Sequence, residues 1–409
     1  MSRSSTLRFI WGCLAASMAV GPATGVVAAL FLRALTWATA FRIAHPSVAF
    51  ALPLAGVLLG VAYQRYGLAT LGGTRLVLHT LRCGGPKLPA RMAPMVFAGT
   101  VWSHFFGASV GREGTALQLG GSIADSFSER IGAPTQMRQT LLASGVAAGF
   151  GALFGTPAAG AVFAIGLLPP RTWPSAALPI ALSSFIADRT AHLCGATHSV
   201  FAAVSSTRLG ARLVLQWCLL AIALALCARA FSALTESIKR ESERWISYRP
   251  WRTGAGGLLL VAAWQLSGTA NYLGLGVATI ERAVGGGAVP SYAWALKLVM
   301  TAVSVGSGFI GGEVTPLFFV GATLGNCFAT LTGAPLALAA AIAMVGLFGV
   351  AARSPLAVAV MAAELFGVHA FAHALFVSAL ACLWAGEGIY APLSVDEPAA
   401  DGEQATGSQ

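Results

Sequence analysis

Charged side chains are scarce in this sequence of 409 residues. Asp, Glu, Lys and Arg make up 10% of it, whereas 56% of the residues are hydrophobic. Soluble domains carry about 25% charged residues, so the composition excludes an ordinary soluble domain and predicts a polytopic protein embedded in a lipid bilayer. Acidic residues are the scarcest, because 15 Asp and Glu stand against 25 Lys and Arg. We assign the excess of positive charge to cytoplasmic loops.

The signatures of several other protein classes are also missing. The seven cysteines show no Cys-x-x-Cys spacing and mostly lie in apolar runs, so we predict no disulfide framework. His369 and His373 are four residues apart but have no third ligand nearby, so we predict no metal site and no cofactor. No basic patch is interleaved with aromatic residues, which argues against a nucleic-acid partner.

Glycine, by contrast, is abundant, with 48 residues. Many apolar segments are shorter than the roughly 20 residues that a helix needs to cross a bilayer, and Gly or Pro interrupts others. Examples are Gly21-Pro22 within a first span at Phe9–Phe41, Gly155-Thr156-Pro157, and Arg353-Ser354-Pro355. Short helices at membrane depth are tolerated only where they are buried in protein or line a polar cavity. The sequence therefore predicts an all-α membrane fold with many short, broken helices.

The composition changes along the chain divide it into four parts. Residues 1–234 form a first transmembrane half, and residues 253–392 form a second. Between them, residues 235–252 are rich in charge and predict a basic helical linker on the cytoplasmic side. Residues 393–409 are acidic, small and polar, which predicts a disordered tail.

The stretch Gly111-Arg112-Glu113-Gly114-Thr115 places two charged residues between apolar runs. A charged residue at the centre of a membrane helix costs roughly 2.5 to 3.5 kcal/mol on insertion scales. The apolar run that follows predicts a helix, so the charged pair lies at a helix N-terminus, where backbone N–H groups and the helix dipole favour an anion. The alternative is a Glu that only forms a salt bridge with Arg112 at a helix cap.

A second copy of this stretch lies 200 residues later. Residues 111–121 read GREGTALQLGG and residues 311–321 read GGEVTPLFFVG, so Glu113 and Glu313 share a register. Interrupted apolar segments that recur in corresponding halves indicate the binding site of a transporter. Chance matching of glycines and leucines does not explain a recurring carboxylate in a chain where carboxylates are scarce.

These two stretches resemble motifs of the CLC chloride channels and transporters. Residues 111–115 resemble the family's GREGP motif, and Gly311-Gly312-Glu313-Val314-Thr315-Pro316 falls where the family has GxFxP. The likeness covers roughly residues 10–392, and Thr115, Glu313 and Thr315 point to the bacterial fluoride/proton antiporter branch. The resemblance implies an inverted-topology repeat, a homodimer, and a place in the bacterial inner membrane.

The resemblance also implies roles for individual residues. Glu113 is the gate, because its carboxylate can occupy the anion site when ionised and leave it when protonated. Glu313 either passes protons or caps a helix, and the sequence leaves both readings open. Thr315 either binds the anion or bonds back to its helix, and Tyr390 either binds the anion or is an aromatic at the membrane interface. The residues expected to bind the anion are Gly73, Thr74, Arg112, Gly114, Thr115, Gly312, Val314, Thr315 and Tyr390.

The sequence thus predicts a fluoride/proton antiporter that exports fluoride from a bacterial cell. A chloride/proton antiporter or a voltage-independent chloride channel of the same fold is the alternative. An intramembrane enzyme that uses Glu113 and Glu313 as acid and base is a third reading. We predict that the protein is not an enzyme, because nothing supplies substrate-orienting residues or a nucleophile–base pair.

Overall fold

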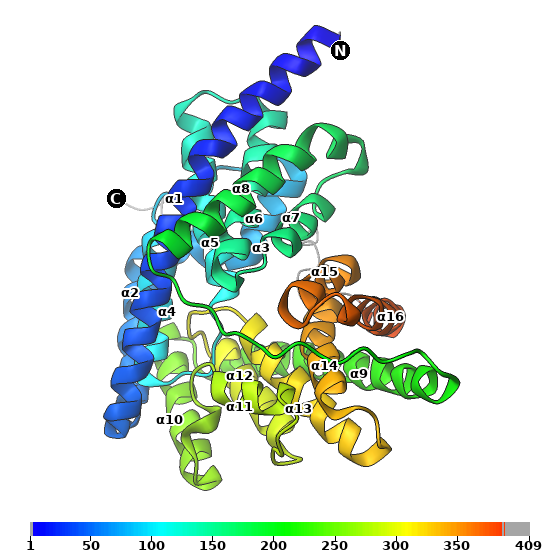
Figure 1. Cartoon of the computed structure of the whole chain (residues 1–409). Helices are drawn as coiled ribbons and strands as arrows, with labels where there is room; N and C mark the ends of the chain where they lie inside the picture. The colour runs from blue at the N-terminus through cyan, green and yellow to red at the C-terminus, as the bar shows by residue number, and fades with distance from the viewer. Residues whose placement is uncertain (1–2, 387, 389–409) are drawn as a thin grey trace, which may run out of the picture.

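The computed structural model describes residues 3–386 and 388, and within them nearly all regular structure is helical (Figure 1). Short 3-10 turns lie at Pro46–Ala51, Leu68–Thr70, Pro170–Thr172 and Ala270–Tyr272. The α-helices are α1 (Arg3–Ala44), α2 (Leu52–Tyr66), α3 (Gly73–Cys83), α4 (Met92–Phe106), α5 (Glu113–Arg130), α6 (Thr135–Phe154), α7 (Pro157–Gly166), α8 (Trp173–Leu193), α9 (Ala211–Trp245), α10 (Arg249–Ser267), α11 (Val277–Val284), α12 (Ala293–Gly306), α13 (Val314–Thr332), α14 (Leu336–Ala351), α15 (Pro355–Phe366) and α16 (His369–Trp384).

Short apolar helices are frequent, as the sequence predicts. Four described helical segments are long and apolar enough to cross a membrane, namely Phe9–Ala44, Pro46–Tyr66, Ala211–Trp245 and Val314–Thr332. Five other apolar helices, including α7, α14 and α15, have only 10–17 residues. Many of their residues are buried in the protein, which is the condition under which short helices are tolerated at membrane depth.

The two predicted helix breaks after the motifs are present at both positions. Chain direction changes between α6 and α7, where Gly155 has a φ of +69°, and between α14 and α15, where Arg353 has a φ of +54°. Pro157 and Pro355 then begin the following helices. Proline is tolerated at this position because a backbone N–H in the first turn has no hydrogen-bond acceptor within the helix. The two halves therefore reproduce the same helix–break–helix pattern.

The expected interruption of the first span at Gly21-Pro22 is wrong. Helix α1 continues through Pro22 for 42 residues. Tertiary packing explains this: Gly25 lies so close to α8 that a Cβ atom on it would approach the backbone oxygen of Ala187 to 2.5 Å. Close packing of two helices at small residues compensates for the backbone hydrogen bond that a proline removes.

The expected boundaries of the linker fall inside helices. Residue 235 lies within α9, which runs on to Trp245, and residue 253 lies within α10. Figure 1 shows that α5–α8 gather at the top and α10–α14 at the bottom, and that the extended segment 194–210 crosses from α8 to α9. The tail at 393–409 lies outside the described residues.

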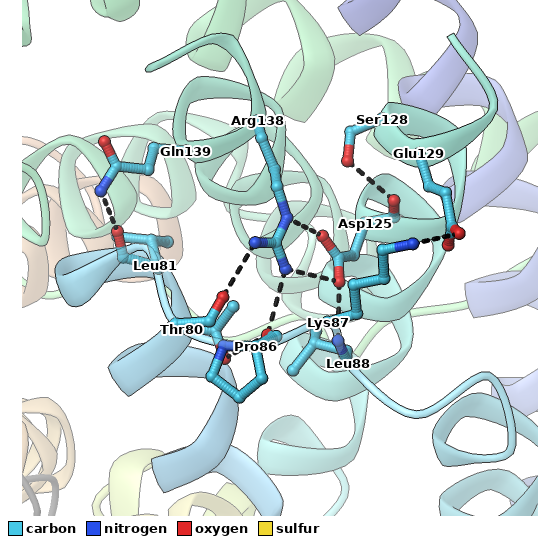
Figure 2. Close-up of polar contacts among 11 residues, drawn as sticks. Thr80, Leu81, Pro86, Lys87, Leu88, Asp125, Ser128, Glu129, Arg138 and Gln139 are labelled. Carbon is cyan, nitrogen blue, oxygen red and sulfur yellow. Dashed lines mark hydrogen bonds and ion pairs between the residues drawn. The ribbon is translucent and has the colours of Figure 1, made fainter. Parts of the chain in front are cut away.

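The connector between α3 and α4 is fixed by a buried ion pair (Figure 2). Asp125 of α5, which is 4% exposed, accepts two hydrogen bonds from the Arg138 guanidinium at 2.6 and 3.0 Å. Arg138 also donates to the carbonyl oxygens of Gly85 and Pro86, and the Asp125 carboxylate also accepts the Leu88 N–H at 2.7 Å. The burial of Asp125 thus accompanies a pair of charges that anchors residues 85–88.

We predict that Asp125→Ala strongly destabilises the protein, because it leaves the Arg138 charge unpaired. Removing one partner of a buried ion pair typically costs about 3–5 kcal/mol. Thermal unfolding of the purified protein in detergent should therefore show a Tm several degrees lower. The matched control is Glu129→Ala, which breaks the exposed pair of Lys87 and Glu129 and should leave Tm almost unchanged. Equal shifts for the two variants would contradict this assignment.

Candidate functional site

The two repeated motifs meet through their backbones. Gly111 and Gly312 form an isolated antiparallel bridge, in which the Gly312 N–H donates to the Gly111 carbonyl at 2.8 Å and the Gly111 N–H donates back. A Cβ atom on Gly312 would lie 2.6 Å from the Gly114 nitrogen, so this approach requires glycine. The bridge sets the N-termini of α5 and α13 side by side.

The Glu113 carboxylate lies at the N-terminus of α13, which belongs to the other half of the chain. Its side chain is 1% exposed. Oε2 accepts the N–H of Thr315 at 2.9 Å and the N–H of Arg112 at 3.1 Å. Oε1 accepts the Thr315 hydroxyl and the Arg112 Nε–H, the latter at 3.3 Å. Four donors that converge on one buried carboxylate form a binding position for an anion.

Both sequence readings of Glu113 are therefore partly visible in the structure. The salt bridge with Arg112 exists. The carboxylate nevertheless reaches across to Thr315 rather than only capping its own helix, α5. This crossing between halves is the feature that a simple helix cap would lack.

Glu313 approaches the opposite helix in a corresponding way. It is the residue just before α13 and is partly exposed. Its Oε2 atom lies 3.9 Å from the position that a Cβ atom would take on Gly114, in the first turn of α5. Each half thus places a carboxylate near the start of the other half's helix. Val314, the first residue of α13, is 2% exposed.

The start of α3 also lies close to the backbone of Gly114. Thr74, in the first turn of α3, lies with its hydroxyl oxygen 3.1 Å from the same Gly114 position. The hydroxyl donates to the Gly114 carbonyl at 3.4 Å and accepts from the Gln118 amide at 3.2 Å. Gly73 adopts a φ of +52°, which favours glycine, and packs against Gln118. Sequence reasoning missed Gln118, although a lone polar residue one turn after Gly114 was the available signal.

Thr115 points elsewhere. Its hydroxyl pairs with the Thr100 hydroxyl of α4 at 2.7 Å and not with the Glu113 carboxylate. The Thr100 carbonyl in turn is 2.8 Å from Nδ1 of His104. The Thr115 hydroxyl therefore has a partner on α4 in this structure, and the role of Thr115 in anion binding stays a prediction.

A cavity of about 40 Å³ opens beside the Glu113 carboxylate. A space of roughly 10–15 Å³ on this measure holds one water molecule, so a small ion or water fits. We call this space the Glu113 cavity. Its lining combines the polar residues of the site with apolar walls and consists of Arg112, Glu113, Phe154, Ser199, Phe201, Val277, Ile280, Thr315, Phe318, Met344 and Leu365.

The structure thus brings together most of the candidate residues from three distant stretches of the chain. The Glu113 carboxylate contacts both Arg112 and Thr315. Thr74, Gly312 and Glu313 lie near Gly114, and Gly73 lies against Gln118. Three candidates remain: the Thr115 hydroxyl contacts α4, Val314 is the buried first residue of α13, and Tyr390 lies outside the described residues.

Comparisons with known proteins identify the family and the fold. A family model described as voltage gated chloride channel matches residues 55–387. The chain is 40% identical over 375 residues to the chloride/fluoride channel protein of Pseudomonas syringae pv. tomato, across 88% of this chain and 81% of that protein. It is also similar to the crystal structure of a CLC-type fluoride/proton antiporter, with a TM-score of 0.88, 32% identity, and coverage of 93% of this chain and 97% of the other. A slow cyanobacterial chloride/proton antiporter shares the fold, with a TM-score of 0.79, 20% identity, and coverage of 92% and 96%.

Proposed function

The chain belongs to the voltage-gated chloride channel family, and on that premise we propose that it exchanges fluoride for protons and exports fluoride across the bacterial inner membrane. The family relation and the CLC-like all-α fold confirm two predictions made from the sequence. They make the protein a multi-pass ion transporter. Fluoride as the substrate and proton coupling are the finer proposal.

The position of the Glu113 carboxylate carries the proposal. An ionised carboxylate resembles a small anion in charge and in its capacity to accept hydrogen bonds, so it competes with the substrate for the Thr315 N–H and hydroxyl. A proton on Glu113 removes the charge and weakens the contact with Arg112 as well. The side chain then leaves, and an anion enters. The Glu113 side chain either carries a proton or occupies the anion position. The proton flux and the anion flux are therefore coupled.

The donors at this position suit fluoride. Fluoride is small and strongly hydrated, so a site for it must replace water with short, strong donors. The Thr315 hydroxyl and N–H come from one residue and converge on one carboxylate. The Glu313 carboxylate nearby supplies a second protonatable group close to Gly114. In our proposal Glu313 exchanges protons with Glu113 as the anion moves.

Flux measurements on the protein reconstituted in liposomes test the proposal. A fluoride electrode and a pH probe follow both ions at once. We expect a fluoride gradient to drive proton movement in the opposite direction, and a chloride gradient of the same size to drive little. Chloride-driven proton movement of equal or greater rate would favour the chloride/proton antiporter, and anion flux without proton movement would favour a channel.

We also propose a homodimer with one pore in each subunit, as the family resemblance implies. Native mass spectrometry of the purified protein tests this directly. A mass of one subunit under conditions that preserve transport activity would contradict it.

A further inference from the structure

Two buried cations that do not line the Glu113 cavity have no acidic partner among the described residues. Arg42 is 6% exposed and Lys297 is 0% exposed. Within the described residues, neither forms an ion pair with Asp, Glu or a chain terminus. Buried charges in proteins are normally paired, and here two side chains of the same sign both lie against the backbone of Gly274.

Lys297 is held by backbone oxygens. Its ammonium group donates to the Tyr272 carbonyl at 3.0 Å and to the Gly274 carbonyl, and it lies 5.3 Å from the centre of the Phe319 ring. These contacts fix the position of the ammonium group but leave its charge without a counter-ion. Lys297 is therefore a buried amine that is fixed in place by backbone oxygens.

Arg42 has fewer partners still. It lies in the last turn of α1 and forms no hydrogen bond with any described residue, and its Nε atom is buried without a partner. Its Nη2 atom lies 2.9 Å from the position that a Cβ atom would take on Gly274, and its Cδ atom lies 3.1 Å from the equivalent position on Gly107. Because neither glycine carries a Cβ atom, the space is open for the Arg42 side chain. Both have positive φ angles, +58° and +99°, which favour glycine at these positions.

The two chain segments that enclose Arg42 both lead into the Glu113 cavity. The segment that starts at Gly107 reaches Arg112, and the segment that starts at Gly274 reaches Val277; Arg112 and Val277 line the cavity. The Gly274 N–H also donates to the Gly107 carbonyl at 3.2 Å, which joins the segments. The segments that contact Arg42 are therefore continuous in the chain with two residues that line the Glu113 cavity.

We propose that Arg42 and Lys297 form a second binding site for a small inorganic anion, beside the Glu113 cavity. The site uses side-chain cations alone, whereas the Glu113 carboxylate is held by helix N-termini together with the Arg112 side chain. An anion there would neutralise the two charges and give the Arg42 Nε–H its missing acceptor. The role of the site in transport rests on the proposed function: a transported fluoride ion would bind there before or after it occupies the Glu113 position.

Equilibrium dialysis with a fluoride electrode tests the site by counting the fluoride ions bound to each chain. The full-length protein is purified in detergent as Glu113→Gln, so that no ionised carboxylate occupies the first position. We expect two fluoride ions per chain, one in Glu113→Gln/Arg42→Gln, and two in Glu113→Gln/Arg42→Lys, which restores the charge. An unchanged count after Arg42→Gln overturns the proposal.

This design separates the second site from the proposed function. If the Glu113 position binds no fluoride, the number of fluoride ions bound per chain falls from one to zero on Arg42→Gln. The loss of one bound ion on removing Arg42 is therefore the same in both cases. In liposomes, Arg42→Gln in the otherwise unchanged protein should raise the KM for fluoride about tenfold and leave the maximal rate within about twofold. A purely structural role for Arg42 would instead lower the maximal rate and Tm, with no recovery in Arg42→Lys.

Discussion

Glu113→Val is expected to abolish proton movement driven by a fluoride gradient. Valine cannot carry a proton, and it removes the acceptor that the Thr315 N–H and hydroxyl and the Arg112 guanidinium share. Anion movement should continue, because the helix N-terminus and its donors remain. In liposomes, the ratio of protons to fluoride ions should fall by at least about 100-fold, to the level of protein-free membranes.

The matched control for this prediction is Glu364→Gln. Glu364 is also a carboxylate that binds backbone N–H groups, those of Ala158 and Ala159 at the start of α7, at 2.9 and 2.8 Å. It does not line the Glu113 cavity. Its replacement should leave the ratio of protons to fluoride ions unchanged. Full coupling in Glu113→Val, or an equal loss in both variants, would refute the gate assignment.

The core of the site was predictable because it depends on local sequence. The Gly-x-Glu pattern at residues 111–113 recurs at 311–313, and a helix start after each motif follows from the apolar run behind it. Glycine at 111 and 312 also has a local meaning, since only glycine permits so close a backbone approach. These signals were sufficient to predict that two helix N-termini from different halves would form the site.

The remainder depends on contacts between distant segments. The direction of the Thr115 hydroxyl is decided by Thr100 of α4, and the passage of α1 through Pro22 is decided by its packing on α8. Arg42 and Lys297 are 255 residues apart in the chain and read as isolated charges until both are found at Gly274. No periodic pattern in a single sequence reports such pairings.

The Thr315 hydroxyl should determine the strength and selectivity of anion binding. Thr315→Val keeps the backbone N–H and nearly the same shape but removes the hydroxyl that contacts the Glu113 carboxylate. A hydrogen bond to a charged group contributes about 1.5–3 kcal/mol, so fluoride affinity in the Glu113→Gln protein should fall by about 10- to 100-fold. Chloride is a weaker hydrogen-bond acceptor, so its affinity should fall less.

The matched control makes the same substitution on the same helix. Thr323 of α13 is also buried, but its hydroxyl bonds back to the Phe319 carbonyl at 2.8 Å and does not line the Glu113 cavity. Thr323→Val should therefore leave fluoride affinity within about twofold. The measurement is equilibrium dialysis with fluoride and with chloride on both variants. If Thr315→Val weakened both anions equally, the hydroxyl would contribute to affinity alone, and fluoride selectivity would have to arise from the shape of the cavity.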